Sequence, residues 1–262
     1  MTQEKSTKRK TLRRAVLIII AAIFLISAVF IGICLFTERP AVQEISVYQS
    51  MFPDTVIRAA EDGGAEIFPQ EVKSADTGII FYVGAQIRPS AYIPLLARLS
   101  EEGYACFIPD LSFNTALLEP NAAEAVMKAH PEIDSWVMAG HSLGGFAASG
   151  FADDHRDAVD GLIFIAAYGS RDLSGAGLPM LSVFGDADGV LSRKRYEERR
   201  GWNSKDFEEY VIAGANHAQF GDYGKQPRDN DALITADEQQ AQTADIILDW
   251  LNRHTQGGGK DE

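Results

Sequence analysis

Ser142 stands in a sequence that could make its hydroxyl a nucleophile. Residues 140–145 read Gly-His-Ser-Leu-Gly-Gly, a Gly-x-Ser-x-Gly pattern between an apolar run and a helix-forming segment of small residues. A serine hydroxyl is a weak nucleophile unless a tight turn exposes it beside a base and near donors for an oxyanion. Glycines flank such a serine because the turn and the close contact between helix and strand leave no room for side chains. The pattern predicts a catalytic nucleophile at Ser142; the alternative is a serine that caps a helix after a tight loop.

A serine nucleophile needs a base, and a near-neutral imidazole can take its proton and return it to the leaving group. His141 is the variable residue of the turn itself, and we expect its neutral ring to pack beside that turn. His217 lies in the loop after the last predicted strand. The remaining candidates precede the turn, follow the helix that leaves it, or end the last helix: His130, His155 and His254.

An imidazole base needs a carboxylate that orients it and stabilises its charged form. The segment Gly185-Asp186-Ala187-Asp188-Gly189 follows an apolar run over residues 180–184 and offers two carboxylates. Spacing alone leaves both Asp186 and Asp188 open as the acid.

The elements that must position these groups alternate along the chain. Two short extended segments at 56–60 and 65–69 flank Asp62-Gly63-Gly64, which predicts a hairpin of edge strands. From Gly78 onward, buried-strand patterns alternate with amphipathic helical ones. The predicted strands are 78–83, 104–108, 136–139, 161–165, 180–184 and 209–212, and the predicted helices are 90–102, 119–129, 142–153, 193–200 and 236–253. The alternation predicts a three-layer α/β/α sandwich with a mostly parallel sheet. Only about fifteen residues separate the strands ending at 165 and beginning at 180, so we expect no large cap domain.

This order of strand, Gly-His-Ser-Leu-Gly-Gly, helix, acid and histidine resembles the α/β-hydrolase superfamily over residues 55–254. The resemblance implies that His217 is the base, because the superfamily places its histidine after the last strand. The family pattern Gly-x-x-Asp selects Asp188 as the acid, which leaves Asp186 as a solvated or turn-capping residue. The stretch 216–224 is also similar to a subgroup of bacterial, often membrane-anchored hydrolases of unassigned substrate.

The resemblance also implies an oxyanion hole made of two backbone N–H groups. One comes from Leu143, directly after the nucleophile. The other comes from the turn after the strand 78–83, where Ala85 occupies the donor position and Gln86 is the nearest alternative. Many relatives carry His-Gly where this chain has Val83-Gly84. A backbone donor does not depend on that histidine.

The amino-terminal region predicts a membrane anchor. Residues 15–36 contain no charge and one polar side chain, and as a helix they measure about 33 Å, the thickness of a bilayer core. Six basic residues precede this segment, so we expect a cytoplasmic tail over residues 1–14 and the rest of the chain outside the cytoplasmic membrane. A cleaved signal peptide is the rival, but the apolar run is long and no small-residue cleavage site follows it. A linker over 37–54, the hydrolase domain over 55–254 and a disordered tail over 255–262 complete the predicted organisation.

The part of the chain that follows the anchor is strongly acidic. The whole chain has 24 basic and 37 acidic residues, and residues 1–37 hold six and one of them, which leaves 18 against 36, a formal charge of −18. Such a domain repels phosphate backbones, so we expect no nucleic-acid partner. The two cysteines, Cys34 in the apolar segment and Cys106 in a strand, predict no disulfide within the chain.

The residues indicate no cofactor and no metal. Four aspartates after His217 have a spacing that matches no calcium-binding loop, so we expect a solvated acidic loop beside the pocket. They are Asp222, Asp229, Asp231 and Asp237.

The leading hypothesis is a membrane-anchored, extracytoplasmic serine hydrolase that cleaves a small or lipid-like carboxylic ester through an acyl-enzyme on Ser142. The same triad could serve amide or thioester hydrolysis or acyl transfer, because a fold does not fix a substrate. A non-catalytic extracellular binding module is the alternative from another class. The sequence does not indicate an oligomeric state.

Overall fold

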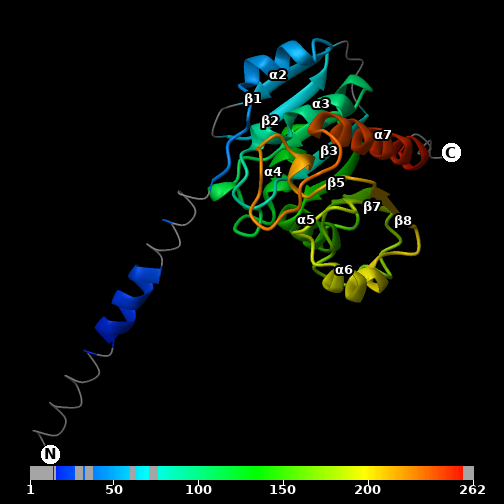
Figure 1. The fold of residues 1–262 in the computed structure, drawn as a ribbon. Coiled ribbons are helices and arrows are strands. Elements are labelled where there is room, and N and C mark those ends of the chain that lie inside the picture. Colours follow the sequence, from blue (N-terminus) through cyan, green and yellow to red (C-terminus); the bar gives the residue numbers. More distant parts are fainter. Residues whose placement is uncertain are drawn as a thin grey trace, which may run out of the picture. The chain divides into compact units, whose positions relative to one another are not determined.

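A computed structural model describes residues 14, 16–26, 32, 38–59, 63–70 and 76–255. The chain forms two compact units, residues 1–38 and residues 39–262. Figure 1 shows the second unit as a sheet with helices on both of its faces.

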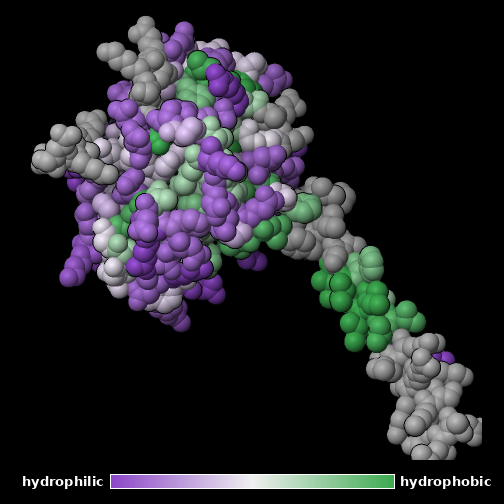
Figure 2. Space-filling model, turned by 180° about the vertical axis from the view of Figure 1, so that it is seen from behind, coloured by the Kyte–Doolittle hydropathy of each residue, from purple (hydrophilic) through white to green (hydrophobic). Residues whose placement is uncertain are grey.

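The described residues 16–26 of the first unit are helical, and their apolar side chains are exposed (Figure 2). No helix among the described residues is both long and apolar enough to cross a membrane. The predicted span 15–36 lies in part outside the described residues, as do residues 1–13 of the predicted tail and residues 256–262 at the other end.

An eight-stranded sheet forms the centre of the second unit, in the order β1-β2-β4-β3-β5-β6-β7-β8. The strands β1 and β2 form the predicted hairpin, β2 also pairs antiparallel with β4, and every further pair is parallel. This confirms the mostly parallel sheet, although β2 is an internal strand and the sheet edges are β1 and β8. The strand bounds are β1 Thr55–Ala59, β2 Ala65–Pro69, β3 Thr77–Tyr82, β4 Ala105–Ile108, β5 Ser135–His141, β6 Gly161–Ile165, β7 Met180–Gly185 and β8 Phe207–Ile212.

Helices cover both faces of the sheet (Figure 1), which is why the central strands are apolar along their whole length. On one face lie α3 (Ile93–Glu101) and α7 (Ala236–His254), and on the other lie α4 (Ala122–Ala129), α5 (Leu143–Asp154) and α6 (Arg193–Arg199). Short 3₁₀ turns complete the fold at η1 Pro89–Tyr92, η2 Ser112–Asn114, η3 Arg200–Trp202 and η4 Ala218–Phe220. A capping box between Thr235 and Glu238 begins α7.

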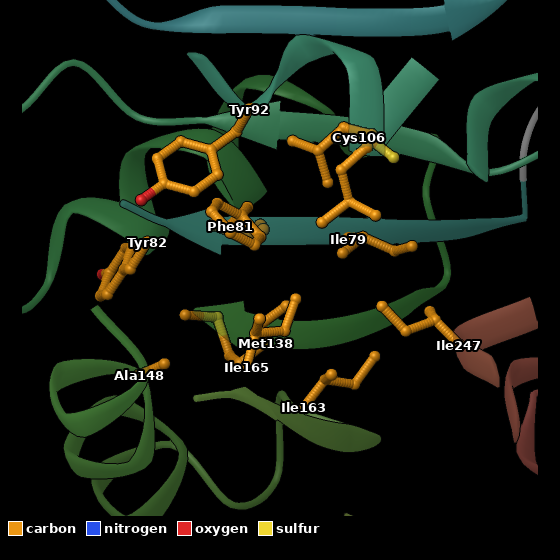
Figure 3. Close-up of a cluster of buried hydrophobic side chains, with 14 of the residues drawn as sticks. Ile79, Phe81, Tyr82, Tyr92, Cys106, Met138, Ala148, Ile163, Ile165 and Ile247 are labelled. Atoms are coloured by element: carbon orange, nitrogen blue, oxygen red, sulfur yellow. The ribbon is translucent and has the colours of Figure 1, made fainter. Parts of the chain in front are cut away.

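The core is divided by the sheet into two packed layers. Figure 3 shows Tyr92 on one side of β3 and Ala148 of α5 on the other. The fully buried Trp250 of α7 packs over β6 where a glycine leaves space for it: a Cβ on Gly161 would lie 2.7 Å from the indole ring. Residue size at the contact therefore sets how closely α7 approaches the sheet.

The predicted linker 37–54 differs from the structure, because residues from 39 onward are part of the folded second unit. They include the helix α2 (Ile45–Met51). Its Tyr48 is fully buried and donates its hydroxyl proton to Asp222 at 2.7 Å. A single buried aromatic in a short helix leaves little periodicity in the sequence, since most of the helix surface faces water.

Candidate active site

Ser142 occupies a strained turn between β5 and α5. Its φ is 54° and its ψ is −119°, a conformation that side-chain-bearing residues seldom adopt. Two main-chain bonds hold it there: its N–H donates to the carbonyl of Ile165 (2.9 Å), and its carbonyl accepts from Phe146 (3.2 Å). Strain at a serine between a strand and a helix is the geometry that exposes a nucleophilic hydroxyl.

The glycines around Ser142 allow the backbone to approach closely. A Cβ on Gly144 would lie 2.0 Å from the carbonyl oxygen of Tyr82, the last residue of β3. A Cβ on Gly145 would lie 2.5 Å from the Cβ of Ala167, which follows β6. The first turn of α5 therefore packs directly on the ends of β3 and β6. Neither glycine can be replaced without moving the turn.

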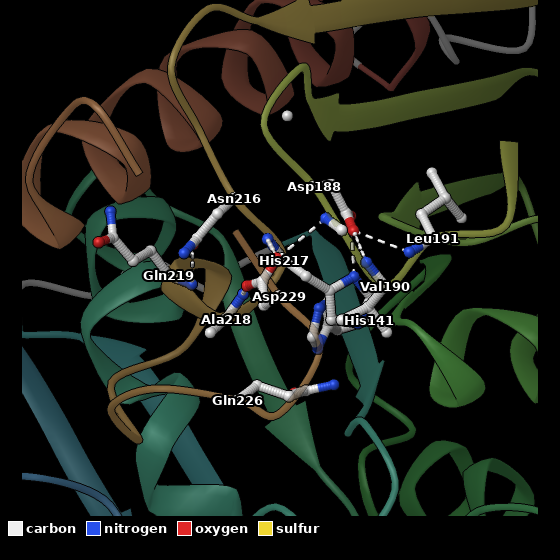
Figure 4. Close-up of polar contacts among 12 residues, drawn as sticks. His141, Asp188, Val190, Leu191, Asn216, His217, Ala218, Gln219, Gln226 and Asp229 are labelled. Carbon is white, nitrogen blue, oxygen red and sulfur yellow. Dashed lines mark hydrogen bonds and ion pairs between the residues drawn. The ribbon is translucent and has the colours of Figure 1, made fainter. Parts of the chain in front are cut away.

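Asp188 and His217 form a buried pair. The carboxylate Oδ2 of Asp188 accepts a hydrogen bond from Nδ1 of His217 at 2.8 Å, and its Oδ1 accepts from the N–H groups of Val190 (2.8 Å) and Leu191 (2.7 Å) (Figure 4). Burial acts to raise the pKa of Asp188. The hydrogen bond and charge of His217, together with the two backbone donors, outweigh burial and hold that pKa below its ordinary value. The ionised carboxylate fixes the tautomer of His217 with its proton on Nδ1.

That tautomer leaves Nε2 of His217 as a proton acceptor. Within the described residues, this buried nitrogen has no hydrogen-bond partner. The ring lies 4.5 Å from the ring of His141, the residue directly before Ser142. The structure thus brings the acid and the base together beside the strained turn, although no hydrogen bond joins His217 to Ser142 among the described residues. Such contacts often tighten only when substrate binds.

Asp186 has a different partner from Asp188. Its Oδ1 accepts from the N–H of Gly214 (2.7 Å), in the turn between β8 and His217. Beside it, Ala187 donates to the carbonyl of Ala215 (3.0 Å). These contacts join the loop that carries Asp188 to the loop that carries His217, and they hold Asp186 away from the imidazole.

The two predicted oxyanion donors lie at adjacent ends of β3 and α5. In the turn after β3, the N–H of Gly84 donates to the hydroxyl of Tyr92 (3.0 Å), and the N–H of Gln86 donates to the carbonyl of Asn114 (3.0 Å). Between them, the N–H of Ala85 makes no hydrogen bond within the described part of the chain. Leu143 is the first residue of α5, where N–H groups have no partner within the helix.

His141 is held neutral inside the protein. The hydroxyl of Tyr92 accepts from the N–H of Gly84 and also forms a hydrogen bond with Nδ1 of His141, 2.8 Å away. Burial, and after it the neighbouring His217, hold the pKa of His141 well below its ordinary value. The predicted packing role of this ring is what the geometry supports. The other three histidines each lie beside a glutamate: His130 beside Glu132, His155 beside Glu124, and His254 beside Glu208.

Asp229, which we expected in a solvated acidic loop, is instead bound to the backbone of the site. Its Oδ1 accepts from the N–H groups of Gly189 (3.0 Å) and His217 (3.3 Å), and its Oδ2 accepts from Ala218 (2.8 Å). One half-buried carboxylate therefore binds the acid loop and the base loop at once. Gly189 fits against this segment because it has no side chain: a Cβ there would lie 2.6 Å from the carbonyl of Arg228. No local pattern marks this contact, because its partners are 11 to 40 residues away in sequence.

The other aspartates of this segment have separate partners. Asp222 accepts from Tyr48, Asp231 pairs with Lys225 at 2.6 Å, and Asp237 pairs with Arg98. Across the described part of the chain, no three His, Cys, Asp or Glu residues come close enough together to hold a metal ion.

A sequence model of the alpha/beta hydrolase family matches residues 78–241, more than half of the chain. The chain belongs to this family. No curated protein has a significant match to the sequence.

Solved structures share the fold at low sequence identity. A predicted CIB-like hydrolase from Thermoplasma acidophilum has 16% identity and a TM-score of 0.54, over 74% of this chain and 99% of that one. An alpha/beta hydrolase enzyme from the metagenome of sediments of the Mar Chica lagoon in Morocco has 14% identity and a TM-score of 0.56, over 76% and 98%. Est1E from Butyrivibrio proteoclasticus has 15% identity and a TM-score of 0.54, over 76% and 99%. At this identity, the likeness shows the fold and leaves the substrate open.

Proposed function

We propose that this protein is a serine hydrolase that cleaves carboxylic esters through an acyl-enzyme on Ser142. The observation that carries the proposal is the buried pair of Asp188 and His217, joined by an Nδ1–Oδ2 bond of 2.8 Å beside the strained serine turn. Among the residues that the structure describes, Nε2 of this imidazole has no hydrogen-bond partner. An imidazole fixed in this tautomer is prepared to accept one proton. Membership of the alpha/beta hydrolase family supports the same chemistry.

In the first half of the reaction, Oγ of Ser142 attacks the acyl carbon and its proton passes to Nε2 of His217. The bond between the acyl carbon and the alcohol oxygen then breaks, and the alcohol leaves with that proton. The N–H groups of Leu143 and Ala85 stabilise the negative oxygen of each tetrahedral intermediate. Asp188 stabilises the transient imidazolium without taking up its proton.

In the second half, water gives a proton to His217 and its oxygen bonds to the acyl carbon. The bond to Oγ of Ser142 breaks, the serine regains the proton, and the carboxylic acid leaves. The same single proton on His217 would also serve an amide or a thioester, and we choose the ester because an alcohol leaves the tetrahedral intermediate more readily than an amine does.

The proposal includes a membrane anchor at residues 15–36, with the amino terminus in the cytoplasm and the hydrolase domain outside. Its support is the uncharged length of this segment and the six basic residues before it.

A fluorophosphonate probe tests the catalytic proposal, because it forms a covalent bond with an activated serine. We expect the wild type and Ser112→Ala, a variant at an exposed loop serine, to be labelled, and Ser142→Ala to stay unlabelled while folded. A folded wild type without label would refute the enzyme and favour a binding module. A panel of matched esters, amides and thioesters then tests the substrate class; amide turnover that exceeds ester turnover would overturn the ester assignment.

A thiol reagent that does not cross membranes tests the topology. A cysteine is placed in the glycine-rich segment 257–259, in a background of Cys34→Ser and Cys106→Ser. We expect reaction on whole cells, after the outer membrane is opened if the host has one. Reaction only after lysis of the inner membrane would contradict the exterior location.

A further inference from the structure

The loop that leads into His217 is held by a side chain of α7. Gln239 is fully buried, and its amide bonds to both main-chain groups of Asn216: Oε1 accepts from the N–H (3.0 Å), and Nε2 donates to the carbonyl (2.8 Å). Because an N–H can only donate and a carbonyl can only accept, this pairing fixes which way the amide faces. Asn216 directly precedes the base, so the pair places the backbone at the start of the base loop.

The main chain of Asn216 depends on this one amide. Within the part of the chain that the structure describes, its N–H and its carbonyl have no hydrogen-bond partner besides Gln239. Asn216 is 7% exposed, and a buried backbone group that loses its partner is costly. Removal of the amide therefore frees this stretch of backbone to rotate toward another partner.

The peptide unit between Asn216 and His217 is bound at both of its polar groups. Gln239 of α7 binds its carbonyl, and the carboxylate of Asp229 accepts from its N–H at 3.3 Å. The two groups of a trans peptide point in opposite directions, so the plane is held from two sides. Rotation of this plane changes the φ angle of His217 and moves the imidazole with it.

The first turns of α7 also bind the residues that follow His217. Nε2 of Gln240 donates to the carbonyl of Gln219 in η4 (3.2 Å). Nε2 of Gln219 in turn donates to the carbonyl of Ile234 (2.9 Å), just before the helix, and at 3.4 Å to Oε1 of Gln239. Figure 4 shows Gln219 beside His217. Neutral amides of one helix end thus hold the base loop before and after the imidazole.

The contact at Asn216 needs a side chain that donates and accepts without a charge. A carboxylate has the shape of a carboxamide, but it cannot donate to the carbonyl of Asn216. An aliphatic side chain of similar size fills the space and leaves both main-chain groups unpaired. A protonated carboxylic acid is the nearest substitute for the amide of Gln239, because its O–H donates where Nε2 does.

We propose that Gln239 is a positioning residue for the base: through the peptide between Asn216 and His217, it holds the imidazole where Nε2 can take the proton of Ser142. The inference rests on the proposed function and adds a residue from α7, outside the triad and the oxyanion hole. Gln239 acts on the chemical step through the backbone, so its loss should change kcat and leave KM nearly constant.

Fluorophosphonate labelling, together with kcat and KM for a soluble ester, tests the proposal on the full chain. In Gln239→Leu we expect kcat and the labelling rate to fall about 10- to 100-fold with KM within about twofold, because a displacement of about 1 Å at a reacting group costs about 100-fold in rate. The matched control is Thr243→Val. Thr243 is also fully buried in α7, and its hydroxyl donates to the carbonyl of Gln239 inside the helix (2.7 Å). Whatever this control does to Tm, it should leave both rates within about twofold, since the lost bond is internal to α7.

The variant Gln239→Glu separates positioning from packing by its pH dependence. The protonated acid makes both bonds to Asn216 and the carboxylate loses one, and burial raises the pKa of such an acid. The titratable groups on the two segments that meet there are Glu238 on α7 and His217 and Asp229 on the loop. All three are present in the wild type, so the ratio of the two labelling rates at one pH removes their titration. We expect this ratio to rise at least about threefold from pH 9 to pH 6, and that of Gln239→Leu to stay flat.

Two results would overturn the inference in samples that circular dichroism shows to be folded. One is a ratio for Gln239→Glu that does not change with pH, and the other is labelling of Gln239→Leu at the rate of the wild type. If Gln239→Leu does not fold, the pH series of Gln239→Glu decides, begun at pH 6 where the acid keeps both bonds. A folded wild type that takes no label refutes the proposed function instead.

Discussion

Replacement of Asp229 by alanine is the perturbation that most directly tests how the site is held together. The carboxylate accepts from the N–H groups of Gly189 (3.0 Å), His217 (3.3 Å) and Ala218 (2.8 Å). Each hydrogen bond to a charged acceptor contributes about 1.5–3 kcal/mol when buried. Asp229 is only half buried, so water replaces part of what is lost. We therefore expect the free energy of unfolding to fall by about 2–4 kcal/mol.

The effect on catalysis follows from the two loops that Asp229 joins. Without it, the backbone at His217 and the backbone at Gly189 can move apart, and the imidazole shifts relative to Ser142. A displacement of about 1 Å at a reacting group costs about 100-fold in rate. We expect kcat/KM for a soluble ester and the rate of fluorophosphonate labelling to fall together by about 10- to 100-fold. Asp229→Asn keeps one acceptor oxygen and should recover part of both rates.

The matched control is Asp231→Ala, two residues along the same loop. Asp231 is exposed and pairs with Lys225 at the surface, so both rates should stay within about twofold of the wild type. Denaturant titration and labelling kinetics on the same samples separate stability from positioning. If Asp229→Ala loses stability but is labelled at the rate of the wild type, the carboxylate does not position His217 and the reasoning fails.

Three further perturbations test other parts of the structure. Gly144→Ala places a Cβ 2.0 Å from the carbonyl oxygen of Tyr82, so we expect loss of the folded state or a fall of several degrees in Tm in a thermal scan. In the control Gly175→Ala the new Cβ meets nothing within 4 Å, so Tm should not change. Near pH 6.5 the imidazole of residue 141 takes up a proton in the unfolded chain, whereas buried His141 stays neutral in the folded protein. The free energy of unfolding should therefore fall by about 1 kcal/mol between pH 7.5 and 5.5. A pH dependence that persists in His141→Asn would contradict this. Tyr92→Phe removes the acceptor of Gly84 and the hydrogen-bond partner of His141, so we expect about a tenfold loss of kcat with little change in KM. An unchanged kcat would show that the turn at Ala85 holds without this hydroxyl.

The strands and the serine turn could be predicted because their causes are local. A run such as residues 161–165 is apolar throughout since helices cover both of its faces, and β6 begins and ends at those residues. The glycines around Ser142 mark the turn because the backbone contact at Gly144 excludes any side chain. Each of these patterns can be recognised within a window of about ten residues.

The contacts that join distant segments could not be predicted. Spacing alone leaves Asp186 and Asp188 equivalent, and the choice of Asp188 came from the resemblance to the family. In the structure Asp186 accepts from Gly214, and Asp188 accepts from His217. The helix α2 was missed because it is short and its one buried residue, Tyr48, depends on Asp222 for its place. Asp229 was expected to be solvated, since nothing nearby in the sequence shows that the backbone donors of Gly189, His217 and Ala218 meet its carboxylate.

The backbone contacts between the acid loop and the base loop divide the site into a fixed part and a variable part. Asp186, Ala187 and Gly189 all bond to the segment from Gly214 to Asp229, so Asp188 and His217 form one body that tolerates little change in loop length. The connection over residues 166–179 contains no helix and takes no part in those bonds. Insertions in the connection 166–179, in evolution or by design, could change the substrate specificity while Asp188 and His217 keep their geometry. The segments that hold the catalytic residues are therefore different from the segment in which specificity can change.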